Sequence, residues 1–195
     1  YVGLSDSYDG ASHHAITDIS FTRAIPGMVV LTPSDAVMTG KAVRAAAAYE
    51  GPVYMRLSRA AAPVIYEEAM DFGIGKGIRV REGSDVTIVV TGTLLGKALA
   101  AADLLAGVGV SAEVIDMHTV KPLDEELLAA SAKKTGAVVT FEEHSICGGL
   151  YGAVTEALAR LCPVPADGIG ATSYAESGDY DALLSKYGYT PEALA

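Results

Sequence analysis

The chain has 195 residues, of which 50% are hydrophobic and 19% charged, so its composition supplies a buried core and excludes an intrinsically disordered protein. There are 14 Lys and Arg against 24 Asp and Glu, a net charge of −10, which gives a nucleic acid no general attraction. No apolar run reaches the roughly 18–20 residues that a membrane helix needs. We therefore expect neither a nucleic acid nor a membrane as a partner.

The two cysteines, Cys147 and Cys162, form no CxxC pair. So low a count is typical of a reducing compartment, and it predicts a cytoplasmic location. The sequence opens at Tyr1 without an initiator Met and without the basic and apolar regions of a signal peptide. We therefore expect the chain to begin partway through a larger unit.

The first 65 residues predict an incomplete α/β unit. Strands are expected at 28–31 and 52–57, and helices at 14–25 and 34–50. Two strands and two helices leave sheet edges unpaired and supply little material for an independent core. We therefore predict that part of this domain is missing from the chain, and that the glycine-containing stretch at 66–83 is a linker.

From residue 84 to residue 195, short β-branched runs alternate with helical segments rich in Ala and Leu. The expected strands are 85–90, 110–117, 137–141 and 167–171, and the expected helices are 94–105, 124–134, 148–161 and 179–188. This alternation produces right-handed crossovers and a parallel sheet with helices on both faces. The predicted fold class is α/β, a partial unit followed by a doubly wound, mainly parallel-sheet domain.

A dense polar cluster precedes the first expected helix. It consists of Ser5, Asp6, Ser7, Asp9, Gly10, Ser12, His13 and His14. The free N–H groups of a helix N-terminus bind an anion or a developing oxyanion, and histidines donate protons near neutral pH. In the alternative interpretation, Ser12 or Asp9 only caps the helix and the histidines are surface residues.

Charged residues also follow several expected strands. Arg56 and Arg59 end the strand at 52–57, where an arginine can bind a phosphate through two hydrogen bonds, although exposed arginines without a ligand are an equal alternative. Among the residues after later strands are His118 and the run from Glu142 to His144. For these we favour a role at a subunit interface.

The sequence contains no motif for a metal site, a nucleotide phosphate site or a serine hydrolase. The histidines and cysteines have no metal-ligand spacing, and the sequence contains no P-loop and no GxSxG elbow. Gly73, Gly75 and Gly77 do not precede a helix, so they indicate a loop rather than a phosphate site.

Five segments, at 9–35, 51–59, 83–92, 114–128 and 138–154, resemble transketolases in the same order. The chain is most similar to the C-terminal section that some prokaryotes make as a separate subunit. The resemblance implies the last part of a pyrimidine-binding domain at 1–65 and a transketolase C-terminal α/β domain at 84–195. It also implies transfer of a two-carbon ketol unit between sugar phosphates.

On the same resemblance, His13 matches the histidine that contacts the substrate oxygens, Asp9 the aspartate that contacts a sugar hydroxyl, and Arg59 the arginine that binds the phosphate. A second substrate histidine of the family falls where this chain has Tyr1.

The family uses thiamine diphosphate with a divalent metal, Mg or Ca, held by upstream residues. We therefore expect no cofactor or metal on this chain alone, no activity without an N-terminal transketolase section or subunit, and a homodimer.

Three alternatives remain open. Deoxyxylulose phosphate synthase and the beta subunit of 2-oxoacid dehydrogenases share the DG…H and EEH…GG features of this sequence. A non-catalytic domain for assembly or regulation is the third. Pyruvate consumption would favour either of the first two, and loss of sugar phosphate binding on Arg59→Ala would count against the third.

Overall fold

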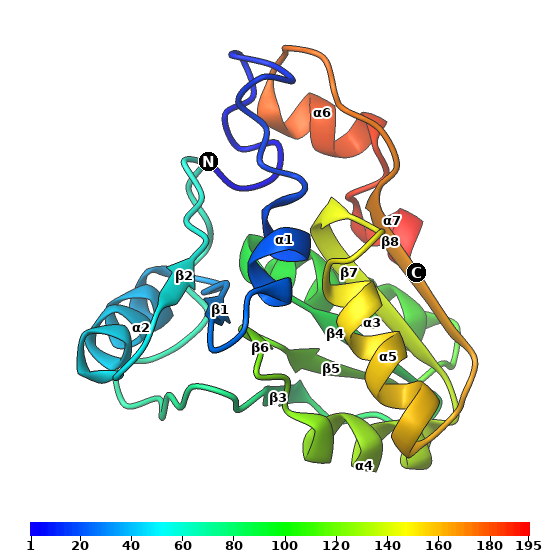
Figure 1. Ribbon diagram of the computed structural model, residues 1–195. Coiled ribbons are helices and arrows are strands. Elements are labelled where there is room, and N and C mark those ends of the chain that lie inside the picture. The colour runs from blue at the N-terminus through cyan, green and yellow to red at the C-terminus, as the bar shows by residue number, and fades with distance from the viewer.

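The computed structural model describes all 195 residues and contains two sheets (Figure 1). The smaller sheet is built mainly from the first 65 residues. Its elements are α1 (Asp18–Ala24), β1 (Val29–Leu31), α2 (Ala36–Ala48) and β2 (Val53–Met55). Strands β1 and β2 are parallel and α2 connects them, which confirms the predicted β-α-β order.

The third strand of this sheet comes from far along the chain. Strand β6 (Thr119–Lys121) pairs antiparallel with β1, with Leu31 opposite Thr119. The sheet order is β2-β1-β6, so β6 covers one edge of β1 and β2 keeps an edge with no strand partner. The sequence did not predict β6.

The larger sheet has the order β3-β5-β4-β7-β8. Its strands are β3 (Ile78–Arg81), β4 (Val86–Val90), β5 (Ala112–Asp116), β7 (Val138–Ser145) and β8 (Ala166–Ala171). All neighbours are parallel except β3, which pairs antiparallel with β5. The α/β class with a mainly parallel sheet is confirmed, and β3 forms an edge strand within the stretch at 66–83.

Helices cover both faces of the larger sheet (Figure 1). They are the 3-10 helix η1 (Gly92–Leu94), α3 (Leu95–Gly107), α4 (Glu125–Thr135), α5 (Leu150–Leu161), α6 (Tyr180–Lys186) and α7 (Pro191–Leu194). The ends of α4 follow the sequence signals, because Asp124 accepts a hydrogen bond from the Leu127 N–H and Gly136 ends the helix at φ 77°. None of the helices combines the length and apolar character needed to cross a membrane.

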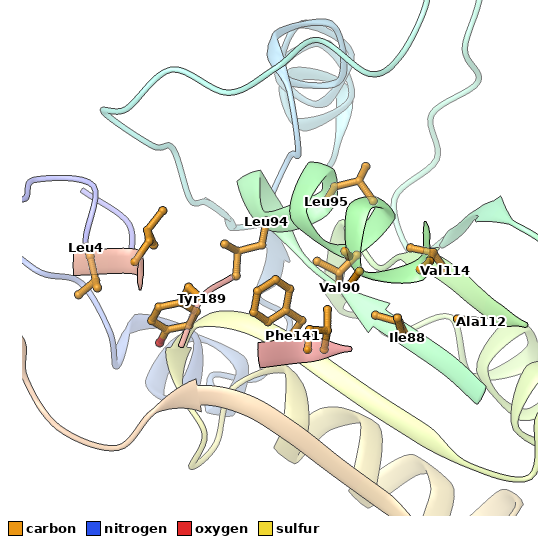
Figure 2. Close-up of a cluster of buried hydrophobic side chains, with 14 of the residues drawn as sticks. Leu4, Ile88, Val90, Leu94, Leu95, Ala112, Val114, Phe141 and Tyr189 are labelled. Atoms are coloured by element: carbon orange, nitrogen blue, oxygen red, sulfur yellow. The ribbon is translucent and has the colours of Figure 1, made fainter. Parts of the chain in front are cut away.

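Side chains of β4 point alternately to the two faces. Ile88 and Val90 pack with α3, whereas Val89 packs with α4 and α5. The N-terminal loop joins the α3 side of the core, because Leu4 belongs to the same cluster (Figure 2). Tyr189 lies beside Phe141 there, with 6.2 Å between the ring centroids. The first residues of the chain are therefore packed against the C-terminal sheet.

Candidate active site

The predicted helix start at His14 is wrong. Helix α1 begins at Asp18, with Thr17 as N-cap and no side-chain cap, so neither Ser12 nor Asp9 caps it. One N–H of its first turn, that of Ile19, donates to His144 Nε2 at 3.1 Å. The polar cluster forms a turn-rich loop over residues 1–17 instead.

The N-terminal loop, residues 1–17, lies beside α6 (Figure 1). The Gly178 N–H donates to the Ser7 carbonyl at 3.0 Å, just before α6 begins. The loop, the segment after β2 and the start of α6 enclose a cleft of about 320 Å³. Its lining consists of Ser5, Asp6, Ser7, Tyr8, Asp9, Arg59, Ala60 and Tyr180.

The structure brings two of the three predicted site residues together in this cleft. Arg59 Nη1 is 3.4 Å from Asp9 Oδ2, although the two residues are 50 positions apart. The Arg59 backbone N–H donates to Ser5 Oγ at 3.2 Å, which fixes the arginine to the loop. Its side chain is 57% exposed, so part of the guanidinium is free for a ligand.

His13 lies on the same loop but does not line the cleft. Its side chain is exposed, and its Nδ1 is 2.9 Å from Ser12 Oγ. The backbone N–H of His13 donates to the Gly10 carbonyl at 2.9 Å, so a tight turn carries the ring. Gly10 has a φ of +75°, which favours glycine at this turn.

Asp6 belongs to the predicted polar cluster, but the sequence indicated no role of its own for it. Its carboxylate forms an ion pair with Arg59, and its side chain is only 5% exposed. Burial by itself raises the pKa of Asp6, but the hydrogen bond and charge of Arg59 outweigh it and lower that pKa below its usual value. Asp6 and Arg59 are 53 residues apart, so no local pattern could have predicted the pair.

Tyr1, where the family resemblance places a second histidine, contacts the same arginine. The Arg59 guanidinium carbon lies 5.7 Å from the centroid of the Tyr1 ring. This is a cation–π distance. Tyr1 therefore adds an aromatic contact to the exposed side of Arg59 and supplies no proton-transfer group equivalent to histidine.

Arg56 is buried, with a side chain only 4% exposed, which argues against the suggestion that it holds a phosphate. Its Nε donates to Asp18 Oδ2 at 2.6 Å, and its Nη2 donates to Asp18 Oδ1 at 3.0 Å and to the Ala15 carbonyl at 2.9 Å. Tyr54 also donates to Asp18, at 2.8 Å. Arg56 is a structural residue that fixes α1 to the end of β2.

The acidic residues of β7 are buried within the chain, so the predicted subunit interface is wrong for them. Glu142 accepts the N–H groups of Leu150 and Tyr151 at the start of α5. Glu143 accepts the Leu4 N–H and, at 2.8 Å, the Tyr180 hydroxyl. Burial raises the pKa of both carboxyls to about 7. Glu143 thereby fastens the N-terminal loop to α6.

Two of the buried histidines, His118 and His144, are structural too. His144 accepts the Ile19 N–H on Nε2 and contacts the Ser145 carbonyl through Nδ1 at 2.8 Å, and burial lowers its pKa to about 4. His118 stacks on Phe72 with 4.5 Å between the ring centroids. Neither ring reaches solvent, because both residues are at most 1% exposed. They therefore belong to the core and not to a subunit surface.

The cleft is lined by charged and hydroxyl-bearing side chains. No group of three or more His, Cys, Asp or Glu side chains is arranged to hold a metal ion. The cleft has one guanidinium, two carboxylates and several hydroxyls, a set that suits a polyhydroxylated ligand with an anionic end group.

Family comparisons cover nearly the whole chain. Residues 1–64 match the family described as transketolase, pyrimidine binding domain. Residues 75–194 match the family described as transketolase, C-terminal domain. The two matches follow each other in the order of the two structural units.

Individual relatives agree with this assignment. A 6-deoxy-6-sulfo-D-fructose transketolase subunit from Clostridium sp. (strain MSTE9) is 44% identical over 98% of this chain and 60% of its own length. A putative transketolase C-terminal section from Methanocaldococcus jannaschii is 41% identical over 100% of this chain and 62% of its own length. A 1-deoxy-D-xylulose-5-phosphate synthase from Heliobacterium modesticaldum is 40% identical over 96% of this chain, but over only 30% of its own length.

The fold has a counterpart among solved structures. A protein described as "Split gene transketolase, inactive beta4 tetramer" superimposes with a TM-score of 0.90 at 45% identity, covering 94% of this chain and 60% of that one. This chain thus spans about 60% of the length of the first two relatives and of this structure. On the family matches, the fold and these relatives together, the chain belongs to the transketolase family.

Proposed function

We propose that this chain is the C-terminal section of a thiamine diphosphate-dependent transketolase, which transfers a two-carbon ketol unit between sugar phosphates. The observation that carries the proposal is the cleft in which Asp9 and Arg59 meet beside the turn of His13. Arg59 follows β2, 50 positions from Asp9 on the N-terminal loop, and the fold brings the two together. Pentose phosphate metabolism in the cytoplasm is the corresponding setting.

Each residue has a distinct role in the proposal. The exposed guanidinium of Arg59 binds the anionic end group of the sugar through charge-assisted hydrogen bonds. The carboxylate of Asp9, which is also exposed, accepts a hydrogen bond from a sugar hydroxyl. His13 holds or moves a proton at the substrate oxygens, since its ring is accessible and imidazole can both accept and donate a proton.

The rest of the active site belongs to an N-terminal transketolase section or subunit. That partner holds thiamine diphosphate and its divalent metal, and the cofactor, when bound, supplies the group that carries the two-carbon unit. The chain alone is then inactive. The "inactive beta4 tetramer" of the similar structure supports this proposal, and it shows that protein as a tetramer where we propose a homodimer here.

We also propose the domain division at 1–65, 66–83 and 84–195, as the end of a pyrimidine-binding domain, a linker and a C-terminal domain. The family matches at 1–64 and 75–194 support it. The position of β3 shows that the last residues of this linker pair with the C-terminal sheet.

Reconstitution tests the proposal. The chain is mixed with an N-terminal transketolase section, thiamine diphosphate and Mg²⁺, and ketol transfer from a ketose phosphate to an aldose phosphate is followed. We expect transfer with both proteins and none with either alone. No transfer by the stable complex would reject the assignment.

The synthase relative gives a second candidate function, deoxyxylulose phosphate synthesis, and a 2-oxoacid dehydrogenase beta subunit remains a third. The same complex is assayed with pyruvate in place of the ketose phosphate. Pyruvate consumption without ketol transfer would favour one of these. A non-catalytic role would leave both assays without product, and sugar phosphate binding would then not depend on Arg59.

A further inference from the structure

The lining of the cleft carries more negative than positive charge. Its lining contains one cation, Arg59, and two carboxylates, Asp6 and Asp9. Both carboxylates contact the same guanidinium nitrogen, Nη1. The remaining lining side chains are uncharged serines, tyrosines and an alanine. The positive charge of Arg59 is therefore already balanced by a carboxylate, and the cleft lining carries one net negative charge.

The two carboxylates differ in how firmly they are held. The side chain of Asp6 is 5% exposed, whereas that of Asp9 is 53% exposed. A buried carboxylate is poorly screened by water and salt. Its pairing with Arg59 keeps it ionised. A ligand can displace Asp9 into solvent, but Asp6 stays beside Arg59 as a fixed negative charge.

We infer that Asp6 is a specificity-determining residue, which makes the site favour a sugar end group of one negative charge over one of two. This inference rests on the proposed function and names the charge class of its substrate. A phosphate monoester has a second pKa near 6 and carries almost two charges at pH 7.5, whereas a sulfonate carries one. Asp6 repels the second negative charge of the phosphate, and the cleft lining supplies no second cation to bind it.

The test uses the reconstituted enzyme and two ketoses of equal length, one ending in phosphate and one in sulfonate. The quantity compared is the ratio of their KM values at pH 7.5. In Asp6→Asn we expect KM for the phosphate sugar to fall about fivefold or more relative to that for the sulfonate sugar. The control is Asp103→Asn, which removes a carboxylate that is 75% exposed and outside the cleft lining.

An equal change in both KM values overturns the inference, since it means that Asp6 only positions Arg59. A second measurement needs no variant. In the wild type, KM for the phosphate sugar should fall relative to KM for the sulfonate sugar as the pH falls from 7.5 to 5.5, because phosphate then loses its second charge. A ratio that does not move with pH also overturns it.

Calorimetric binding of the same two sugars to the complex separates this inference from the proposed function. The complex could show no ketol transfer and yet bind the sulfonate sugar more tightly, with Asp6→Asn abolishing that preference. This result would support the role of Asp6 and reject the proposed activity. Ketol transfer without any effect of Asp6→Asn on either binding constant would retain the activity and reject the role of Asp6.

Discussion

Replacing Arg56 by Met tests whether this arginine is structural. Arg56 donates two hydrogen bonds to Asp18, at 2.6 and 3.0 Å, and the two side chains are 4% and 6% exposed. Arg56→Met leaves the Asp18 carboxylate buried with only the Tyr54 hydroxyl as a partner. Removing one member of a buried ion pair costs about 3–5 kcal/mol. That is a large part of the roughly 5–15 kcal/mol by which a domain is stable.

Urea unfolding at pH 7, followed by circular dichroism, measures this loss. The matched control is Arg44→Met, since Arg44 is exposed and donates only to the Gly40 carbonyl at 3.4 Å; we expect a change below about 0.5 kcal/mol. The double variant Asp18→Asn/Arg56→Met should lose less than the sum of the two single variants, because the unpaired charge is gone. An Arg56→Met variant within about 1 kcal/mol of the wild type would refute the reasoning.

Three further outcomes are expected. A Cβ at Gly83 would lie 2.2 Å from the Ala112 backbone carbon, so Gly83→Ala should lower the unfolding free energy by more than about 3 kcal/mol in urea titrations. Burial raises the pKa of Asp116 to about 7, so its contribution to stability is complete below the unfolded pKa and disappears as the pH rises to 7. The unfolding free energy of Asp116→Asn should then rise by roughly 1–3 kcal/mol relative to that of the wild type between pH 5 and pH 8. A difference between the two proteins that stays constant with pH would contradict this. In the reconstituted enzyme, Arg59→Met should raise KM for the ketose phosphate at least about tenfold with kcat within about threefold, whereas Arg44→Met should change neither.

The regular part of the fold could be predicted because its signals are local. The β-branched runs of β4 and β5 are buried, and the helix between them is rich in Ala and Leu. Strands β3 and β6 were missed because their pairing depends on partners elsewhere in the chain. Their stability comes from tertiary pairing and not from local propensity.

The candidate site was predictable only in part. Arg56 and Arg59 look equivalent in the sequence, yet one is 5% exposed and the other has a side chain 57% exposed. What separates them is Asp18, which lies 38 residues from Arg56 and pairs with it. The role of Asp6 was hidden for the same reason. Burial and long-range pairing decide which charged groups remain free, and no local pattern contains that information.

The central claim is that the loop of Asp9 and His13 acts directly on the substrate. Its most direct test is kcat of the reconstituted enzyme carrying His13→Ala. The ring is exposed and lies 2.9 Å from Ser12 Oγ, so we expect the variant to fold. We predict that kcat falls about 100-fold or more, the usual contribution of a proton-transferring side chain. A kcat within about twofold of the wild type would contradict the account.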